Sequence, residues 1–231
     1  MEKIKLPNVT LTAVTSINIS KTVKALQYSM RSIEFGQVVL ISHKKPLFLP
    51  KGISFKYVEK IDNIDKFNYL MVYDIHKYID TEYMMLIHYD GFVVNPQNWN
   101  DEFLKYDYIG APWQDPGPNK PGVLCDADGT VYRVGNSVSL RSKRFMKLPS
   151  EIGLEWKAYG GWYNEDGFLC IHSRKTLERY GCKYAPVELA AQYSRELPVP
   201  EGDGIEPFCF HKRIGENVKY PRFTPIPWIR W

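Results

Sequence analysis

The side chains best suited to chemistry are concentrated in a few short segments, of which His88–Gly91 is the first. Side chains two positions apart on an extended chain point the same way, so His88 and Asp90 can face one ion or phosphate together. A carboxylate in this position suits Mg²⁺ or Mn²⁺, which are hard cations that bind substrate phosphates. A carboxylate in a loop after a strand is also common, and the spacing alone leaves both interpretations open.

A second segment, residues 160–167, combines glycines, aromatic residues and the adjacent acids Glu165 and Asp166. One of these carboxylates could act as a general base, because the glycines allow a ligand or another backbone to approach closely. Trp162 and Tyr163 would offer their ring faces to a sugar. The simpler alternative is that the two acids lie in the first turn of a helix, where they interact favourably with its dipole.

Two other segments carry weaker signals. His211 follows the apolar run Pro207–Phe210, and such a histidine is a ligand candidate only if the chain returns to the edge that holds Asp90. The Gly135-Asn136 pair, followed by alternating small residues, predicts a strand whose backbone lies close to a neighbour. That neighbour could be a ligand or a tightly packed side chain.

The elements that must position these residues follow from hydrophobic periodicity. Apolar runs rich in β-branched residues predict strands at residues 9–14, 37–42, 53–58 and 82–88. Helical spacing predicts one helix through Val23 and Ile33 that ends at Gly36, and a second helix capped by Asp62 or Asn63. This order predicts crossover units and a mostly parallel sheet, whose carboxyl edge would present His88 and Asp90.

Beyond Asp90 the pattern is less regular. A short helix is expected at residues 99–106, strands at 108–113 and 131–140, and a helix from Asn164 to about Tyr180. Residues 114–130 hold three Pro and three Gly and are expected to form a mobile lid. No linker is visible, so a single domain is expected over residues 1–231, with a core of about 8–213 and a Pro- and Trp-rich tail at 214–231.

Composition excludes several classes of protein. The chain has 231 residues, of which 44% are hydrophobic and 24% charged, as in ordinary globular proteins. A net charge of +4 without a basic block argues against a nucleic-acid partner. The four cysteines form no C-x-x-C pair, which excludes a zinc ribbon. With no apolar leader and no stretch of about 18 apolar residues, no signal peptide or transmembrane segment is expected, and the expected location is cytoplasmic.

Taken together, these segments resemble the GT-A class of nucleotide-sugar glycosyltransferases, and in particular a little-characterised bacterial and viral branch known as a domain of unknown function. The likeness runs from about residue 8 to residue 213. It rests on HYDGFVVNPQNWNDEFLKYDYIGAPW (His88–Trp113), VGNSVSLRS (Val134–Ser142), NEDGF (Asn164–Phe168), KYAPVELAAQYSRE (Lys183–Glu196) and PFCFH (Pro207–His211).

The resemblance implies a GT-A-like, Rossmann-like α/β domain with a mostly parallel central sheet flanked by helices. It also implies a donor site that holds Mn²⁺ or Mg²⁺. Asp90 matches the last carboxylate of the Asp-x-Asp motif of such enzymes, His88 replaces the first, and His211 matches a C-terminal metal ligand. The residues implied to contact the nucleotide are Ala13, Val14, Thr15, Ser16, Lys66 and Tyr69.

For the acceptor side, the resemblance implies Asp166 as the base and Glu165 as a contact to the acceptor hydroxyl. The residues implied to bind the acceptor are Trp113, Asn136, Trp162 and Tyr163. The implied reaction moves a sugar from a nucleotide-diphosphate donor to a hydroxyl of a glycan acceptor, with inversion and metal assistance, as in polysaccharide biosynthesis. The alternatives are a catalytically silent carbohydrate-binding module on the same scaffold and a metal-dependent phosphoesterase. The phosphoesterase is disfavoured because no second carboxylate–histidine cluster is visible.

Overall fold

In the computed structural model, which describes residues 2–117, 124–157 and 164–224, one sheet has the strand order β3-β2-β1-β4-β6-β5 and a small second sheet pairs β7 with β8. The strands are β1 (Ile4–Val14), β2 (Ile33–Ser42), β3 (Ser54–Tyr57), β4 (Tyr83–Leu86), β5 (Tyr108–Pro112), β6 (Val134–Ser142), β7 (Ser194–Arg195) and β8 (Cys209–Phe210). The helices are α1 (Ile19–Ser29), α2 (Ile64–Tyr69), α3 (Lys143–Glu151), α4 (Glu165–Gly167), α5 (Arg174–Arg179) and α6 (Val187–Tyr193).

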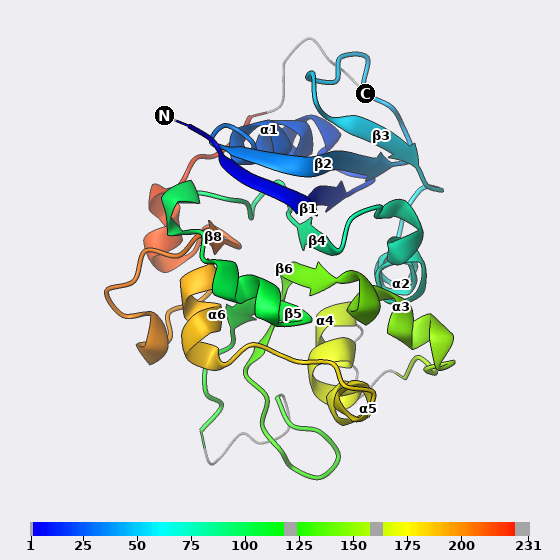
Figure 1. Cartoon of the computed structure of the whole chain (residues 1–231), viewed down its shortest axis with the longest axis vertical. Helices are drawn as coiled ribbons and strands as arrows, with labels where there is room; N and C mark the ends of the chain where they lie inside the picture. The colour runs from blue at the N-terminus through cyan, green and yellow to red at the C-terminus, as the bar shows by residue number, and fades with distance from the viewer. Residues whose placement is uncertain (1, 118–123, 158–163, 225–231) are drawn as a thin grey trace.

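The main sheet is mostly parallel, which confirms the predicted α/β class (Figure 1). β1 pairs in parallel with both β2 and β4, and β2 pairs in parallel with β3, whereas β6 runs antiparallel to β4 and β5. The chain moves outward from β1 to β3 and then returns to place β4 on the other side of β1. The strand order therefore reverses between β1 and β4, which is where open α/β sheets bind ligands.

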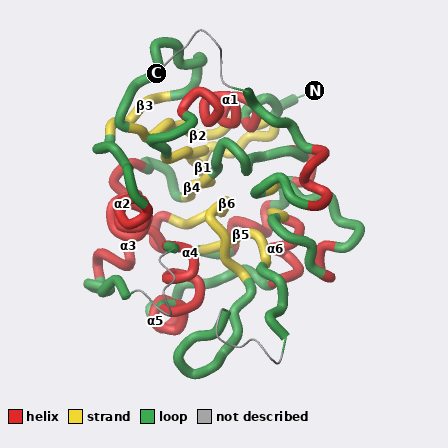
Figure 2. Tube along the Cα trace, turned by 180° about the vertical axis from the view of Figure 1, so that it is seen from behind, coloured by secondary structure: helices red, strands yellow, loops and turns green. Residues whose placement is uncertain are grey.

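The central strands are apolar on both faces because both faces are covered. Along β2, Leu40 packs into the core cluster that includes Leu26 of α1, whereas Val39 and Ile41 pack into a second cluster with Met71, which follows α2. Successive side chains of a strand point to opposite faces, so a strand buried on both sides has a nearly continuous apolar run. Figure 2 shows the strands in the interior with helices around them.

The predicted helix that runs to Gly36 is wrong. α1 ends at Ser29, and Ile33, which continues the helical spacing, begins β2 and pairs with Ile4. Ile33 shares the buried cluster of α1, so its apolar character fits either element. Gly36 does not end a helix: a Cβ at this position would lie 1.9 Å from the carbonyl oxygen of Pro7, so glycine allows β2 to approach β1 closely.

The later helix starts are confirmed. The Asn63 side chain accepts a hydrogen bond of 2.9 Å from the Lys66 amide and caps α2, which continues in π-helical and 3₁₀ turns as far as Tyr78. Asn164 precedes α4, and the helical path then continues to Arg179 in α5. The short helix expected at 99–106 is a 3₁₀ turn at Asp101–Lys105. Within the described ranges, no helix combines the length and apolar character needed to cross a bilayer.

The close approach predicted at Gly135 is a packing contact with Trp113. A Cβ at Gly135 would lie 1.9 Å from Cη2 of the indole. We therefore expect Gly135→Ala to displace Trp113 and to lower the free energy of unfolding by about 1–3 kcal/mol, the usual cost of overpacking. Denaturant unfolding followed by tryptophan fluorescence measures both effects. Gly202→Ala is the matched control, because its nearest neighbour lies at an ordinary 3.6 Å, and equal losses in the two variants would contradict the packing role.

Candidate functional site

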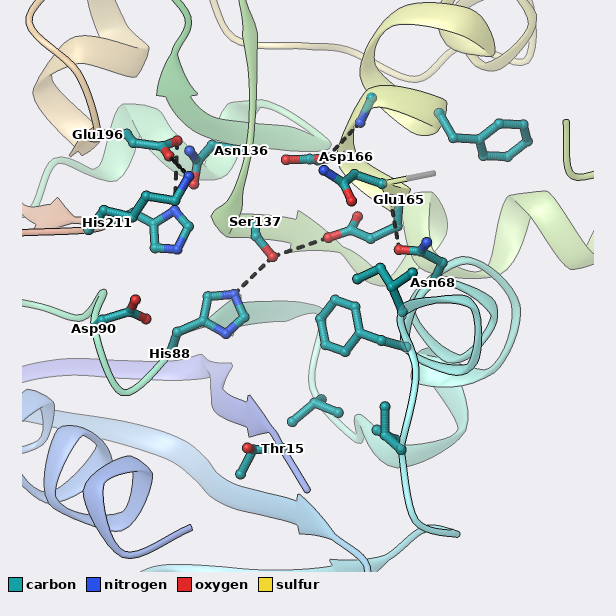
Figure 3. Close-up of a pocket in the computed structure, with 18 of the residues that line it drawn as sticks. Thr15, Asn68, His88, Asp90, Asn136, Ser137, Glu165, Asp166, Glu196 and His211 are labelled. Atoms are coloured by element: carbon teal, nitrogen blue, oxygen red, sulfur yellow. Dashed lines mark hydrogen bonds and ion pairs between the residues drawn. The ribbon is translucent and has the colours of Figure 1, made fainter. Parts of the chain in front are cut away.

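A cavity of about 810 Å³ opens where the strand order reverses, between the carboxyl ends of β1 and β4 (Figure 3). Thr15 and Ser16 follow β1 and line one wall, and His88 and Asp90 follow β4 and line the next. The rest of the lining includes residues of β6, of α2 and the segment before it, of α4 and of the C-terminal segment. Cavities of this size hold whole cofactors or nucleotides.

The C-terminal segment returns to the edge that holds Asp90, which is the condition that His211 had to meet. The amide of Lys212 donates a 2.9 Å hydrogen bond to the carbonyl oxygen of Asp90. A Cβ at Gly91 would lie 2.8 Å from Cδ2 of His211, so the two segments are in close contact. Asp90 and His211 therefore line the same side of the cavity, as Figure 3 shows.

Buried polar contacts hold this returning segment in place. The fully buried Asn217 amide nitrogen lies 3.1–3.3 Å from four carbonyl oxygens, including that of His211. The Glu196 carboxylate forms an ion pair with Lys212 and lies 3.7 Å from Nδ1 of His211. Burial alone would raise the pKa of Glu196, but His211 and Lys212 together hold that pKa below its usual range. The imidazole of His211 is thus positioned from behind by a carboxylate.

His88 is a neutral imidazole with a defined tautomer. Burial, helped by His211 and Arg141, lowers the pKa of His88 to about 3. Its Nε2 lies 2.8 Å from the Ser137 hydroxyl, which itself donates to Oε1 of Glu165 at 3.2 Å. Because the hydroxyl proton is used for Glu165, Nε2 of His88 must be the donor to Ser137. Nδ1 of His88 is left as an acceptor, on the side of the ring that faces Thr15 in Figure 3.

Glu165 belongs to a buried ion pair with Arg141. The Arg141 guanidinium, 1% exposed, lies 3.0–3.1 Å from the two Glu165 oxygens, and the Glu165 side chain is 2% exposed. Although burial opposes the charge of Arg141, the Glu165 carboxylate keeps the pKa of the guanidinium above its usual value. The Glu165 amide donates to Asn68 at 3.0 Å, which fixes the start of α4. Because Oε1 accepts from Ser137 and Arg141, and Oε2 is buried at ion-pair distance from the same guanidinium, the geometry favours a positioning role for Glu165 over the predicted contact to an acceptor hydroxyl.

Asp166, the next residue, lines the cavity and is the carboxyl group best suited to accept a proton. Burial in the cavity wall, followed by the charge of Glu165, raises the pKa of Asp166 to about 6. The Gly167 amide donates to its Oδ1 at 2.8 Å and fixes the orientation of the carboxyl. A general base works best when its pKa lies near the working pH. Asp166 enters the cavity from α4, whereas Asp90 and His211 enter from other elements (Figure 3).

The donor atoms near Asp90 fit a divalent cation that is shared with a ligand. Within the described part of the chain, no group of three His, Cys, Asp or Glu side chains could hold a metal by itself. Mg²⁺, however, is usually bound by one or two protein carboxylates together with substrate phosphates. Asp90 offers a carboxylate, and His211 offers Nε2 of its imidazole, because Nδ1 is the ring nitrogen that lies toward Glu196. The carboxylate of Glu196 behind His211 is the support that metal-bound histidines commonly have.

The structure brings most of the predicted residues to this cavity and places some elsewhere. Besides the acids and histidines above, the predicted residues that line it are Val14, Thr15, Ser16, Trp113 and Asn136. Ala13 is fully buried in the core. Lys66 and Tyr69 do not reach the cavity, because they line a separate cavity of about 730 Å³ beside α2.

Some predicted residues lie outside the described part of the chain. These are Trp162 and Tyr163 and, in the expected lid, residues 118–123. Leu124, from the described part of that lid, lines the main cavity.

Four residues that support the site were not identified from the sequence. Arg141 and Ser137 link His88 to α4, and Glu196 and Lys212 support His211. The sequence did contain one sign that Arg141 has a structural role, because Arg141 is a charged residue inside a strand of small and apolar residues. Such a residue is rarely buried without a charged partner. The sequence did not indicate which acid that partner was.

Comparisons with known proteins identify a family. A family model described as "Protein of unknown function (DUF5672)" matches residues 52–211. No curated protein matches the chain. Among solved structures, the chain is similar to the mannosyltransferase PcManGT from Pyrobaculum calidifontis, in complex with GDP-Man and Mn²⁺, with 10% identity and a TM-score of 0.45. The match covers 79% of this chain and 56% of that one, so this chain spans little more than half the length of that protein.

Proposed function

The chain belongs to the DUF5672 family, and on the geometry of its cavity we propose that it is a glycosyltransferase. In this proposal it moves a sugar from a nucleotide-diphosphate donor to a hydroxyl of a glycan acceptor, in the cytoplasm. The observation that carries the proposal is that one cavity is lined by two kinds of group. Asp166, whose pKa is raised to about 6, lies on one wall, and Asp90 and His211 lie together on another. One group is suited to accept a proton, and the other two are suited to hold a diphosphate through a cation.

The donor is proposed to lie along the carboxyl ends of β1 and β4. Thr15 and Ser16 follow β1 and line the cavity where a nucleoside would be held, and Nδ1 of the neutral His88 offers an acceptor to a donor hydroxyl. Asp90 and His211 would hold Mn²⁺ or Mg²⁺ against the diphosphate. The bound cation would neutralise the negative charge that develops on the leaving diphosphate.

Asp166 is proposed as the base. The acceptor oxygen attacks the anomeric carbon from the face opposite the leaving group, and its proton passes to a carboxylate oxygen of Asp166. The bond between the anomeric carbon and the diphosphate oxygen breaks, and its electron pair leaves with the nucleoside diphosphate. Attack from the opposite face inverts the configuration. Glu165 keeps α4, and with it Asp166, in place through Arg141 and Asn68.

Binding of a nucleoside diphosphate with Mn²⁺ tests the donor site. At a ligand concentration about 100-fold above Kd, binding adds about 2.7 kcal/mol of stability, and for a chain of this size Tm rises by roughly 5–10 °C. We expect this increase for at least one common nucleoside diphosphate in differential scanning fluorimetry. Asp90→Asn and His211→Ala should each reduce it, because each removes a ligand of the shared cation.

The matched control is Asp203→Asn, which removes an exposed carboxylate outside the cavity and should keep the full increase in Tm. The donor site is contradicted if none of the common nucleoside diphosphates raises Tm with Mn²⁺ or Mg²⁺. It is also contradicted if Asp90→Asn and Asp203→Asn respond alike.

A further inference from the structure

The connection between β2 and β3 presents two large apolar side chains to solvent. Leu47 is 83% exposed and Phe48 is 80% exposed, and they are adjacent in sequence. Single exposed apolar residues are common on protein surfaces, but two adjacent and almost fully exposed ones are not explained by packing. Figure 1 shows the connection after β2 projecting at the top of the molecule, away from the sheet.

The connection is anchored on both sides of this pair. Pro46, directly before it, is buried, and Leu49, directly after it, packs against the main core cluster. The amide of Ile53 donates to the carbonyl of Pro50 at 3.1 Å, and Gly52 adopts a φ of 92°, a conformation that favours glycine. The chain around the pair is therefore fixed by its own contacts, so the exposure of Leu47 and Phe48 belongs to the folded structure.

The same connection carries positive charge without any negative charge. From Phe35 to Val58 the sequence contains four lysines and no Asp or Glu. Lys56 pairs with Asp80 at 3.1 Å. The other three, Lys44, Lys45 and Lys51, are exposed and form no ion pair with any described residue. Within the described part of the chain these three ammonium groups are unpaired, and in sequence they lie on both sides of the exposed apolar pair.

We propose that this connection is a membrane-docking tip that binds an anionic lipid surface. Leu47 and Phe48 enter the boundary between headgroups and acyl chains, while Lys44, Lys45 and Lys51 contact the lipid phosphates. Apolar residues flanked by lysines bind anionic bilayers through burial of apolar area and through electrostatic attraction to the lipids. A nucleic acid would contact the lysines and leave the apolar pair in water. Binding at this tip is independent of the proposed transferase activity, because none of these residues lines the cavity.

Vesicle sedimentation of the full chain tests the docking tip. We expect the protein to sediment with vesicles of equal parts phosphatidylcholine and phosphatidylglycerol, and to remain in the supernatant with phosphatidylcholine alone. The double variant Leu47→Ser and Phe48→Ser should weaken binding to anionic vesicles at least about tenfold, because it removes the inserted apolar area. Replacing the three lysines by glutamine should weaken binding about fivefold for each lysine.

The matched control is the double variant Ile214→Ser and Val218→Ser, which removes exposed apolar side chains elsewhere and should bind as the unmodified chain does. No sedimentation of the unmodified chain with anionic vesicles, or equal sedimentation with neutral ones, overturns the proposal. The proposal is also overturned if the variant without Leu47 and Phe48 still binds anionic vesicles as the unmodified chain does, because binding would then depend on charge alone. A dimer in solution that the Leu47 and Phe48 variant converts to a monomer would assign the tip to self-association.

Discussion

Asp166→Asn is expected to lower the rate of sugar transfer by about 10²- to 10⁴-fold, the range for loss of a general base, with donor binding unchanged. The amide has nearly the shape of the carboxyl and can still accept from the Gly167 amide, so α4 keeps its conformation. It cannot accept the proton of the acceptor hydroxyl. Steady-state kinetics give the rate, and titration with the nucleoside diphosphate gives the donor affinity.

The pH dependence provides a second measurement on the same residue. The base must be deprotonated, and burial together with Glu165 raises the pKa of Asp166 to about 6. The transfer rate should therefore rise with pH through about 6 and then level off, and the variant should lack this step. The raised pKa also means that ionising Asp166 costs stability as pH rises between its unfolded and folded values. At neutral pH, Asp166→Asn should consequently be at least as stable as the unmodified chain.

Asp62→Asn is the control for the base, because Asp62 also lines the cavity but is half exposed and paired with Lys66, which lies outside it. We expect this variant to retain activity. The assignment of the base is wrong if Asp166→Asn transfers sugar within tenfold of the unmodified rate. A variant that loses donor affinity and activity to the same extent would place Asp166 in the donor site instead.

Arg141→Met is expected to lower the free energy of unfolding by about 3–5 kcal/mol, the cost of leaving one member of a buried ion pair without its partner. Among the described residues, only Ser137 would then donate to the buried Glu165 carboxylate. Urea denaturation followed by circular dichroism measures the loss. The same change should weaken the chain of hydrogen bonds from Glu165 through Ser137 to His88.

The double variant Arg141→Met and Glu165→Leu tests whether the lost stability comes from the unpaired buried charge of Glu165 or from the changed packing. Replacing both members of a buried pair by apolar residues of similar size is often neutral, so most of the lost stability should return. Lys77→Met is the control, because the Lys77–Asp74 pair is exposed and its loss should leave stability unchanged. A single Arg141 variant as stable as the Lys77 variant would show that the buried pair does not hold α4.

Local features of this protein could be predicted from the sequence because their signals act over a few residues. The runs at residues 9–14 and 37–42 form central strands, since strands buried on both faces are mostly apolar along their length. Asn63 marks a helix start because its side chain caps an amide only three residues away, whereas Asn164 precedes α4 without a side-chain cap. Asp90 follows shortly after β4 in sequence, so its position near the carboxyl edge of the sheet could be expected.

The tertiary structure alone decided which distant residues meet. The return of His211 to Asp90, the pairing of Arg141 with Glu165, and the separation of Tyr69 from the main cavity all depend on how whole elements pack. Ile33 shows the same limit, because its apolar side chain suits the end of a helix as well as the start of β2. Hydrophobic periodicity indicates whether a side chain is buried. The partner against which that side chain is buried depends on the packing of segments far apart in the chain.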